Sequence, residues 1–180
     1  MLTKVISLYG PPGAGKSTAA AGLYYFLKKK GYHCELVREY VKNWVWEGKV
    51  PGTFDQPYLW GKQLKYESIC YGKVDYIITD SPCALAGFYE RLHEEDHVIQ
   101  EAVFNLYNKA AKNGVEYINY WLTPGPDYDV RGRVQNREEM LDVSDKMLSW
   151  LMDNGMKMKH ISLPKDERVS YILKDLSISP

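Results

Sequence analysis

Short apolar runs separated by longer segments of helical length dominate the pattern of the chain. The apolar runs cover residues 5–9, 33–37, 75–79, 116–122 and 160–163. A continuous apolar run bounded by turn residues is typical of a strand buried on both faces. The helical segments cover residues 16–30, 39–47, 55–72, 84–93, 97–113, 136–154 and 165–176. Because strands alternate with helices, we expect an α/β fold in three layers, with a parallel sheet between two helical layers.

Composition and charge indicate the number of domains and the kinds of partner to expect. With 180 residues and 45% hydrophobic positions, the chain has the size and core-forming capacity of one domain, which we assign to residues 1–180. Lys and Arg total 23 and so do Asp and Glu, so no overall charge indicates a nucleic-acid partner. A local basic groove on a neutral protein remains compatible with DNA as a partner.

Cysteine spacing and hydropathy indicate the cellular compartment to expect for the protein. Cys34, Cys70 and Cys83 are scattered and form no CxxC pair, which favours reduced thiols over a disulfide framework. The N-terminal apolar run is too short for a signal peptide, and no other run has the length of a membrane span. We expect a cytoplasmic protein without a membrane partner. The sequence leaves its oligomeric state open, a homodimer included.

The strongest motif follows the first apolar run. Residues 10–18 read GPPGAGKST and match G-x-x-x-x-G-K-[ST] at every fixed position. Glycines let main-chain N–H groups converge on phosphate oxygens, and the following helix directs the positive end of its dipole at the same anion. In such a loop Lys16 reaches the β- and γ-phosphates of ATP, and the Ser17 hydroxyl binds Mg²⁺. The expected nucleotide contacts are Gly10, Gly13, Ala14, Gly15, Lys16, Ser17 and Thr18.

A glycine-rich turn formed by chance is the alternative interpretation of this motif. The context argues against it, because an apolar run precedes residues 10–18 and an Ala-rich helical segment follows them. We therefore predict that the loop binds the phosphates of a nucleoside triphosphate.

Acidic residues follow two other predicted strands, at the sheet edge where ligands of parallel sheets gather. Asp80, after the third strand, is a candidate Mg²⁺ carboxylate, or else a turn or helix-cap residue. Glu39, after the second strand, is a candidate base for the acceptor hydroxyl, or else a solvated residue in the first turn of the next helix. Arg38 could hold an acceptor phosphate or pair with a carboxylate.

Residues 123–137 contain prolines, glycines and three arginines, and we interpret them as a lid loop. Arginines brought in by a closing lid stabilise the charge that spreads over the transferred phosphoryl group. Arg131 and Arg133 are the candidates for this role. A solvated loop with incidental charges is the alternative.

Two further patterns are ambiguous. Aromatic and lysine side chains alternate between Tyr40 and Tyr66, which suits either an acceptor pocket, a nucleic-acid groove or a packed helix face. Residues 93–97 read HEEDH and match the H-E-x-x-H pattern of zinc proteases. Their highly charged surroundings favour a solvated corner between two helices over a zinc site.

Together these residues resemble the P-loop nucleoside and nucleotide kinases. The resemblance rests on residues 10–18, the acidic residue after the second strand and the Asp80-Ser81 pair after the third, where the family's usual intervening arginine is absent. Trp44 and Gln63 resemble the tryptophan and glutamine that these kinases place beside the acceptor sugar and base. The resemblance implies a P-loop NTPase fold with a five-stranded sheet in the order 2-3-1-4-5, and ATP and Mg²⁺ as cofactors.

The implied function is transfer of the γ-phosphate of ATP to a hydroxyl of a nucleoside, a nucleotide or a modified base. Tyr128 to Gln135 also resemble small phage-encoded kinases, some of which act on hydroxymethyl-pyrimidines in DNA, so 5-hydroxymethyluracil in phage DNA is one acceptor to consider. Alternatives are a polynucleotide 5′-hydroxyl kinase and a non-kinase P-loop ATPase or nucleotide sensor. A GTPase is disfavoured because residues 108–111 read NKAA and lack the aspartate of the Asn-Lys-x-Asp motif.

Overall fold

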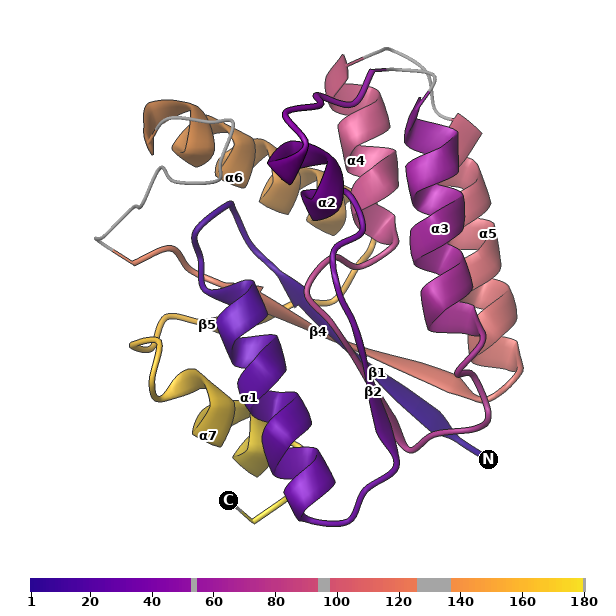
Figure 1. Ribbon diagram of the computed structural model, residues 1–180, viewed down its shortest axis with the longest axis vertical. Coiled ribbons are helices and arrows are strands. Elements are labelled where there is room, and N and C mark those ends of the chain that lie inside the picture. The colour runs from indigo at the N-terminus through magenta and orange to yellow at the C-terminus, as the bar shows by residue number, and fades with distance from the viewer. Residues whose placement is uncertain (53–54, 94–97, 126–136, 180) are drawn as a thin grey trace.

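The structure is a computed structural model that describes residues 1–52, 55–93, 98–125 and 137–179 (Figure 1). Within these ranges the strands are β1 (Thr3–Tyr9), β2 (Cys34–Val37), β3 (Tyr76–Thr79), β4 (Val115–Leu122) and β5 (Lys159–Ile161). The helices are α1 (Lys16–Lys29), α2 (Lys42–Trp46), α3 (Gln56–Ser68), α4 (Ala84–His93), α5 (Val98–Lys112), α6 (Arg137–Asp153) and α7 (Arg168–Asp175). Each predicted strand and helix is present, with shifted ends.

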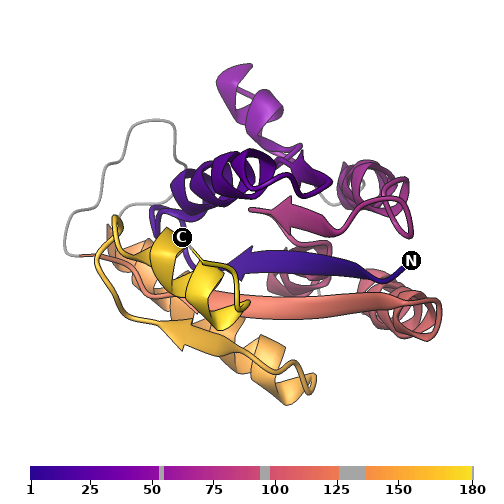
Figure 2. The same ribbon diagram turned by 90° about the horizontal axis from the view of Figure 1, so that it is seen from below.

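The strands form one parallel sheet in the order β2-β3-β1-β4-β5, which confirms the predicted fold and strand order. Figure 2 shows β1 in the middle of the sheet, between β3 and β4. Since all strands run the same way, the residues that follow β1, β2, β3 and β4 lie at one edge of the sheet. This carboxyl edge is where the sequence predicts the site.

Alternate residues of each strand face opposite helical layers. Ile6, Leu8 and Ile78 pack with the apolar face of α1 and with α7, whereas Tyr9 and Trp121 pack with α4, α5 and α6. Both faces of the sheet are therefore buried at the central strands β1 and β3, which explains why these two appear in the sequence as nearly continuous apolar runs. Within the described ranges, no helix combines the length and the apolar character that crossing a membrane requires.

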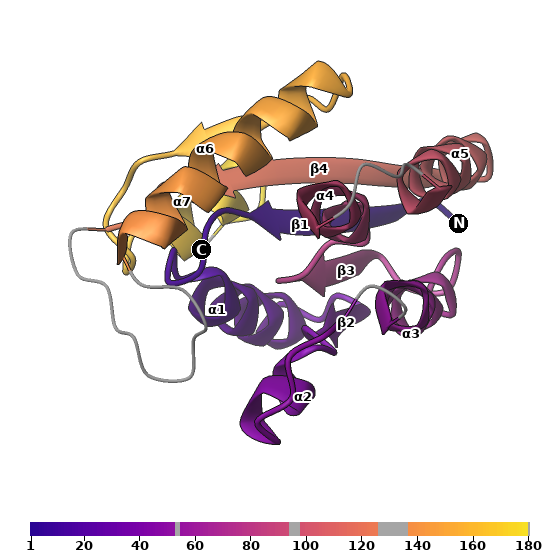
Figure 3. The ribbon, with the colours of Figure 1, turned by 90° about the horizontal axis from the view of Figure 1, so that it is seen from above.

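Most helices are shorter than predicted, and in α2 and α7 the difference affects the site. Helix α2 begins at Lys42, so Glu39 lies in the connection after β2 and not in the first turn of a helix. Helix α7 begins at Arg168 because a turn closed by the bond from the Glu167 N–H to the Pro164 carbonyl comes before it. Helix α2 projects beyond the edge strand β2, as the view from above shows (Figure 3).

Candidate functional site

The phosphate loop, residues 10–18, connects the end of the central strand β1 to the first turn of α1. Gly10, Gly13 and Gly15 have φ angles of 137°, 84° and 86°, which side chains rarely allow. A Cβ atom on Gly10 would also come within 2.5 Å of the Leu122 carbonyl oxygen at the end of β4. The glycines of the motif are therefore needed for the path of this loop between two strands.

The polar groups of the phosphate loop's main chain divide into two sets. Its carbonyls are engaged by cations: the Lys16 ammonium donates to the oxygens of Gly10 at 2.8 Å and Pro11 at 3.0 Å, and the Arg168 guanidinium donates to that of Ala14. In the described residues, the N–H groups of Gly13, Gly15, Ser17 and Thr18 donate to no protein acceptor. A loop with engaged carbonyls and available N–H groups, at a helix N-terminus, has the polarity that a phosphate group requires.

Arg168 is a part of this site that the sequence did not reveal. Its side chain is 3% exposed and reaches the carbonyls of three segments, at Ala14, Leu163 and Thr123. No local pattern marks it, because it is a single arginine in the first turn of the last helix. Only the packing of α7 against α1 brings it to the phosphate loop.

Glu39 and Asp80 lie together beside the phosphate loop. The Asp80 carboxylate, 6% exposed, accepts a hydrogen bond of 3.0 Å from the Glu39 N–H, so the ends of β2 and β3 are joined here. Burial raises the pKa of the Glu39 carboxyl; Lys16 opposes this shift, and Asp80 adds to it. Glu39 therefore combines a desolvated carboxyl with a nearby ammonium, a combination frequent in catalytic bases.

Ser17 and Asp80 are the residues that could hold Mg²⁺. Both offer oxygen ligands, which this cation prefers, and Mg²⁺ typically takes few protein ligands because it keeps water and phosphate oxygens. Ser17 is exposed at the start of α1, and Asp80 ends the neighbouring strand. The donor atoms and their common edge fit a magnesium ion bound with a triphosphate.

Gln63 connects the carboxylate pair to helix α3. Its side chain is 6% exposed, and its Oε1 atom accepts a hydrogen bond of 3.2 Å from the Tyr40 N–H. This bond fixes the amide orientation, since a main-chain N–H requires an acceptor. The Nε2 atom is buried and has no partner among the described residues. Gln63 thus binds the residue that follows Glu39 and has an unused N–H donor there.

Aromatic side chains surround this region on the outside. Trp44 stacks on Tyr58 at 6.1 Å between ring centroids, and the hydroxyls of Tyr40 and Tyr58 lie 2.9 Å apart. The cluster is partly open to solvent: Tyr58 is 48% exposed, and the nearby Trp46 on α2 is 70% exposed. The described aromatic residues of this stretch therefore form a half-exposed surface group, and among them only Trp60 packs against the core.

The remaining predicted residues are either exposed or outside the described ranges. The Arg38 side chain is exposed on the connection after β2. Arg131 and Arg133 lie outside the described residues, as do most of the lid loop and of the H-E-x-x-H pattern. Within the described ranges, no group of three or more His, Cys, Asp or Glu side chains is placed to hold a metal ion.

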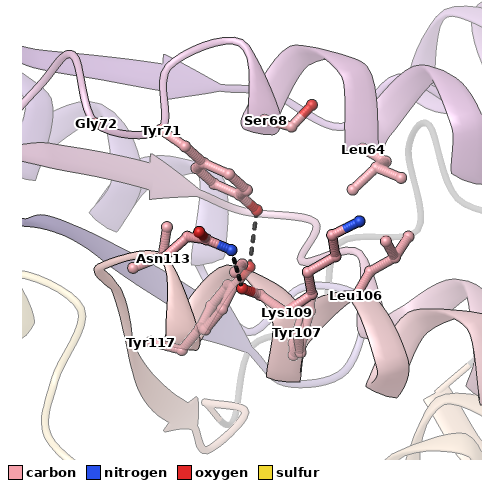
Figure 4. A pocket seen from close by; sticks show the side chains of 11 residues that line it. Leu64, Ser68, Tyr71, Gly72, Leu106, Tyr107, Lys109, Asn113 and Tyr117 are labelled. Atoms are coloured by element: carbon pink, nitrogen blue, oxygen red, sulfur yellow. Dashed lines mark hydrogen bonds between the residues drawn. The ribbon is translucent and has the colours of Figure 1, made fainter.

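A cavity of about 400 Å³ lies away from this edge, between α3 and α5 at the amino ends of β3 and β4 (Figure 4). Its wall includes the hydroxyls of Tyr71 and Tyr117, 2.8 Å apart, as Figure 4 shows. Behind them Glu67 is fully buried and accepts a 2.5 Å hydrogen bond from Tyr71. None of the predicted site residues lines this cavity.

Comparison with known proteins supports the fold. No family model matches the chain, and no curated protein matches it. Among solved structures, a deoxyadenosine kinase from M. mycoides with dATP bound superposes with a TM-score of 0.59 at 16% identity, covering 96% of this chain and 98% of that one. An APS kinase of Mycobacterium tuberculosis superposes with a TM-score of 0.55 at 11% identity, covering 98% of both chains. At these identities the likeness establishes the P-loop kinase-type fold.

Proposed function

We propose that the protein is an ATP-dependent kinase that phosphorylates a hydroxyl group of a nucleoside, a nucleotide or a modified base. One observation carries this proposal: a half-buried carboxyl with a raised pKa, Glu39, lies near Lys16 of the phosphate loop. A nucleotide sensor needs the loop alone. A desolvated carboxylate beside the γ-phosphate position is useful when a hydroxyl proton must be removed.

In this proposal the residues have separate roles in binding and transfer. The N–H groups of the phosphate loop and the Lys16 ammonium bind the β- and γ-phosphates. Glu39 orients the acceptor hydroxyl in line with the γ-phosphorus and accepts its proton. Ser17 and Asp80 would hold Mg²⁺, which would supply positive charge to neutralise the phosphates. Arg131 and Arg133 are proposed to contact the transferred group.

The acceptor lies on the side of Gln63 and Trp44 in this proposal. The buried Nε2 donor of Gln63 requires an acceptor atom, such as a ring nitrogen or a carbonyl oxygen of a base. Trp44 offers an aromatic face within the half-exposed cluster. Two of the similar structures are of deoxyadenosine kinase, one with dCMP and dCDP bound, and this agrees with an acceptor of the nucleoside class.

The test is a transfer assay with γ-labelled ATP against nucleosides, nucleoside monophosphates, 5′-hydroxyl DNA and DNA containing hydroxymethyluracil. We expect label in one acceptor class, dependent on Mg²⁺. ATP hydrolysis that no acceptor stimulates, with no labelled product, would contradict the proposal and favour an ATPase or a sensor.

An acceptor within DNA is a second candidate, favoured by the exposure of the aromatic cluster. Trp46 and Tyr58 are open to solvent, and the Lys62 ammonium lies 5.5 Å from the Tyr58 ring centroid. Exposed aromatics beside lysines can stack on bases and attract phosphates. Two activities would act on an acceptor within DNA: phosphorylation of 5-hydroxymethyluracil in phage DNA, and phosphorylation of a polynucleotide 5′-hydroxyl. The two DNA substrates in the assay distinguish them.

A further inference from the structure

Arg168 has an unusual environment for a buried charge. Its Nε donates to the Leu163 carbonyl at 2.8 Å, its Nη2 to the Thr123 carbonyl at 2.7 Å, and its Nη1 to the Ala14 carbonyl. Within the described part of the chain, no carboxylate pairs with it. A buried cation without an acidic partner is costly to the fold, and carbonyl dipoles compensate only part of that cost.

The three carbonyls come from the three segments that meet at the phosphate site. Ala14 is in the phosphate loop, Thr123 follows β4, and Leu163 follows β5. A planar guanidinium with a fixed fork of donors can hold three such segments in one arrangement, whereas a single ammonium cannot match that geometry. Arg168 therefore fixes the phosphate loop relative to the ends of two strands.

The bond to Ala14 fixes the loop residue that comes directly before the N-cap of α1. That N-cap is Gly15, whose carbonyl accepts from the Ala19 N–H, so Ala14 lies outside the helix. The Thr18 N–H is one of the first donors of the helix and has no acceptor among the described residues. The Ala14 carbonyl accepts from Arg168, which thus holds the loop next to its available N–H groups.

We propose that Arg168 is a positioning residue for the triphosphate: through the Ala14 carbonyl it holds the phosphate loop against the segments that follow β4 and β5, so that the N–H groups of the loop face the anion. The inference rests on the nucleotide-binding half of the proposed function. The acceptor half is not involved, so Arg168 affects nucleotide affinity and leaves the acceptor KM unchanged.

The test measures binding of Mg·ADP by calorimetry to the wild type, Arg168→Met and Arg168→Lys. Arg168→Met should weaken binding by about tenfold or more, because both the fork and the charge are lost. Arg168→Lys keeps the charge without the fork, and we expect a smaller loss, about three- to tenfold. The ADP-induced rise in Tm should shrink in the same order.

A matched control separates positioning from stability. Ile172 lies one turn later on α7, fully buried in the core and without a bond to the phosphate loop. Ile172→Ala should lower the Tm of the free protein and leave the affinity for Mg·ADP within twofold. In the transfer assay, Arg168→Lys should raise the KM for ATP and leave that for the acceptor unchanged.

The outcomes distinguish the two proposals. If the wild type does not bind Mg·ADP, the proposed function fails. If the wild type binds and Arg168→Met binds equally well, the inference about Arg168 is wrong. Should Arg168→Met not fold, Arg168→Lys decides: wild-type affinity in that variant overturns the positioning role, and a selective loss of affinity supports it.

Discussion

The half-buried carboxyl of Glu39 and the fully buried carboxyl of Glu67 differ in their surroundings. Burial raises the pKa of both. Near Glu39, the ammonium groups of Lys16 and Lys42 oppose the shift. Near Glu67, only the side chains of Tyr71, Tyr117 and Cys83 oppose it, through hydrogen bonds, and the pKa reaches about 7.

The difference shows which of the two carboxyls is suited to chemistry. Glu39 is half-buried beside the phosphate loop, and the Lys16 ammonium opposes the rise in its pKa that burial causes, so a ligand can reach a carboxyl that has a cation beside it. Glu67 is enclosed by tyrosines whose own pKa values are raised by burial, and the nearby cavity is lined by Tyr71 and Tyr117 but not by Glu67 itself. A perturbed pKa alone does not identify a catalytic group; the neighbouring charges do.

The strongest way to remove this difference is to delete the cation beside Glu39. Lys16→Ala should lower phosphoryl transfer by about 10³-fold or more, because it removes a donor to the transferred charge and raises the pKa of Glu39 further. The fold should remain intact by circular dichroism. Lys28→Ala, on the same helix and paired with Glu35 on the surface, is the control and should retain wild-type activity. Full activity of Lys16→Ala would overturn the mechanism.

Glu39→Gln tests the catalytic side of the comparison directly. Without a proton acceptor, kcat should fall by about 10²- to 10³-fold, while the affinity for Mg·ATP changes less than twofold. Since burial raises the Glu39 pKa, the rate of the wild type should fall on the acid side at a higher pH than an ordinary glutamate would give. This acid limb should disappear in the variant. An unchanged kcat would remove Glu39 from the role of base.

For Glu67 we expect an effect on stability. From the ordinary pKa of 4.5 to the raised value of about 7, the folded protein retains a proton that the unfolded chain has lost. Stability therefore falls as pH rises through this window, by about 3 kcal/mol in total, and changes no further above it. Denaturant unfolding of Glu67→Gln should lack this component.

An exposed carboxyl provides the control for this measurement. Glu35→Gln, on the surface of β2, should leave the pH dependence of unfolding as it is in the wild type. If Glu67→Gln and the wild type show parallel stability curves from pH 4.5 to pH 7, the carboxyl is not the titrating group.

The sequence predicted the residues of the structure unequally well. The phosphate loop and the positions of Glu39 and Asp80 follow from local patterns, since motif glycines and residues after apolar runs mark the carboxyl edge, and the strand order follows from the family resemblance that these patterns carry. Arg168 and Glu67 could not be predicted, because their roles depend on which helices pack together. In the sequence, Glu67 does not differ from an ordinary helical glutamate. Only the fold brings Tyr117, 50 residues later, close to it.

The smallest effect we predict concerns the acceptor side of Glu39. Gln63→Leu removes the acceptor for the Tyr40 N–H and the unused Nε2 donor, each a hydrogen bond worth about 1 kcal/mol. The acceptor KM should rise about five- to tenfold, with the ATP KM within twofold.

Trp46→Ala, on exposed helix α2, is the matched variant for a polymer acceptor. It should leave the KM for ATP and the KM for a free nucleoside unchanged. It should raise the KM for DNA, because only a polymer extends over that surface. If Gln63→Leu has the same KM as the wild type for every substrate, Gln63 has only a structural role. The acceptor would then have to be placed elsewhere around Glu39.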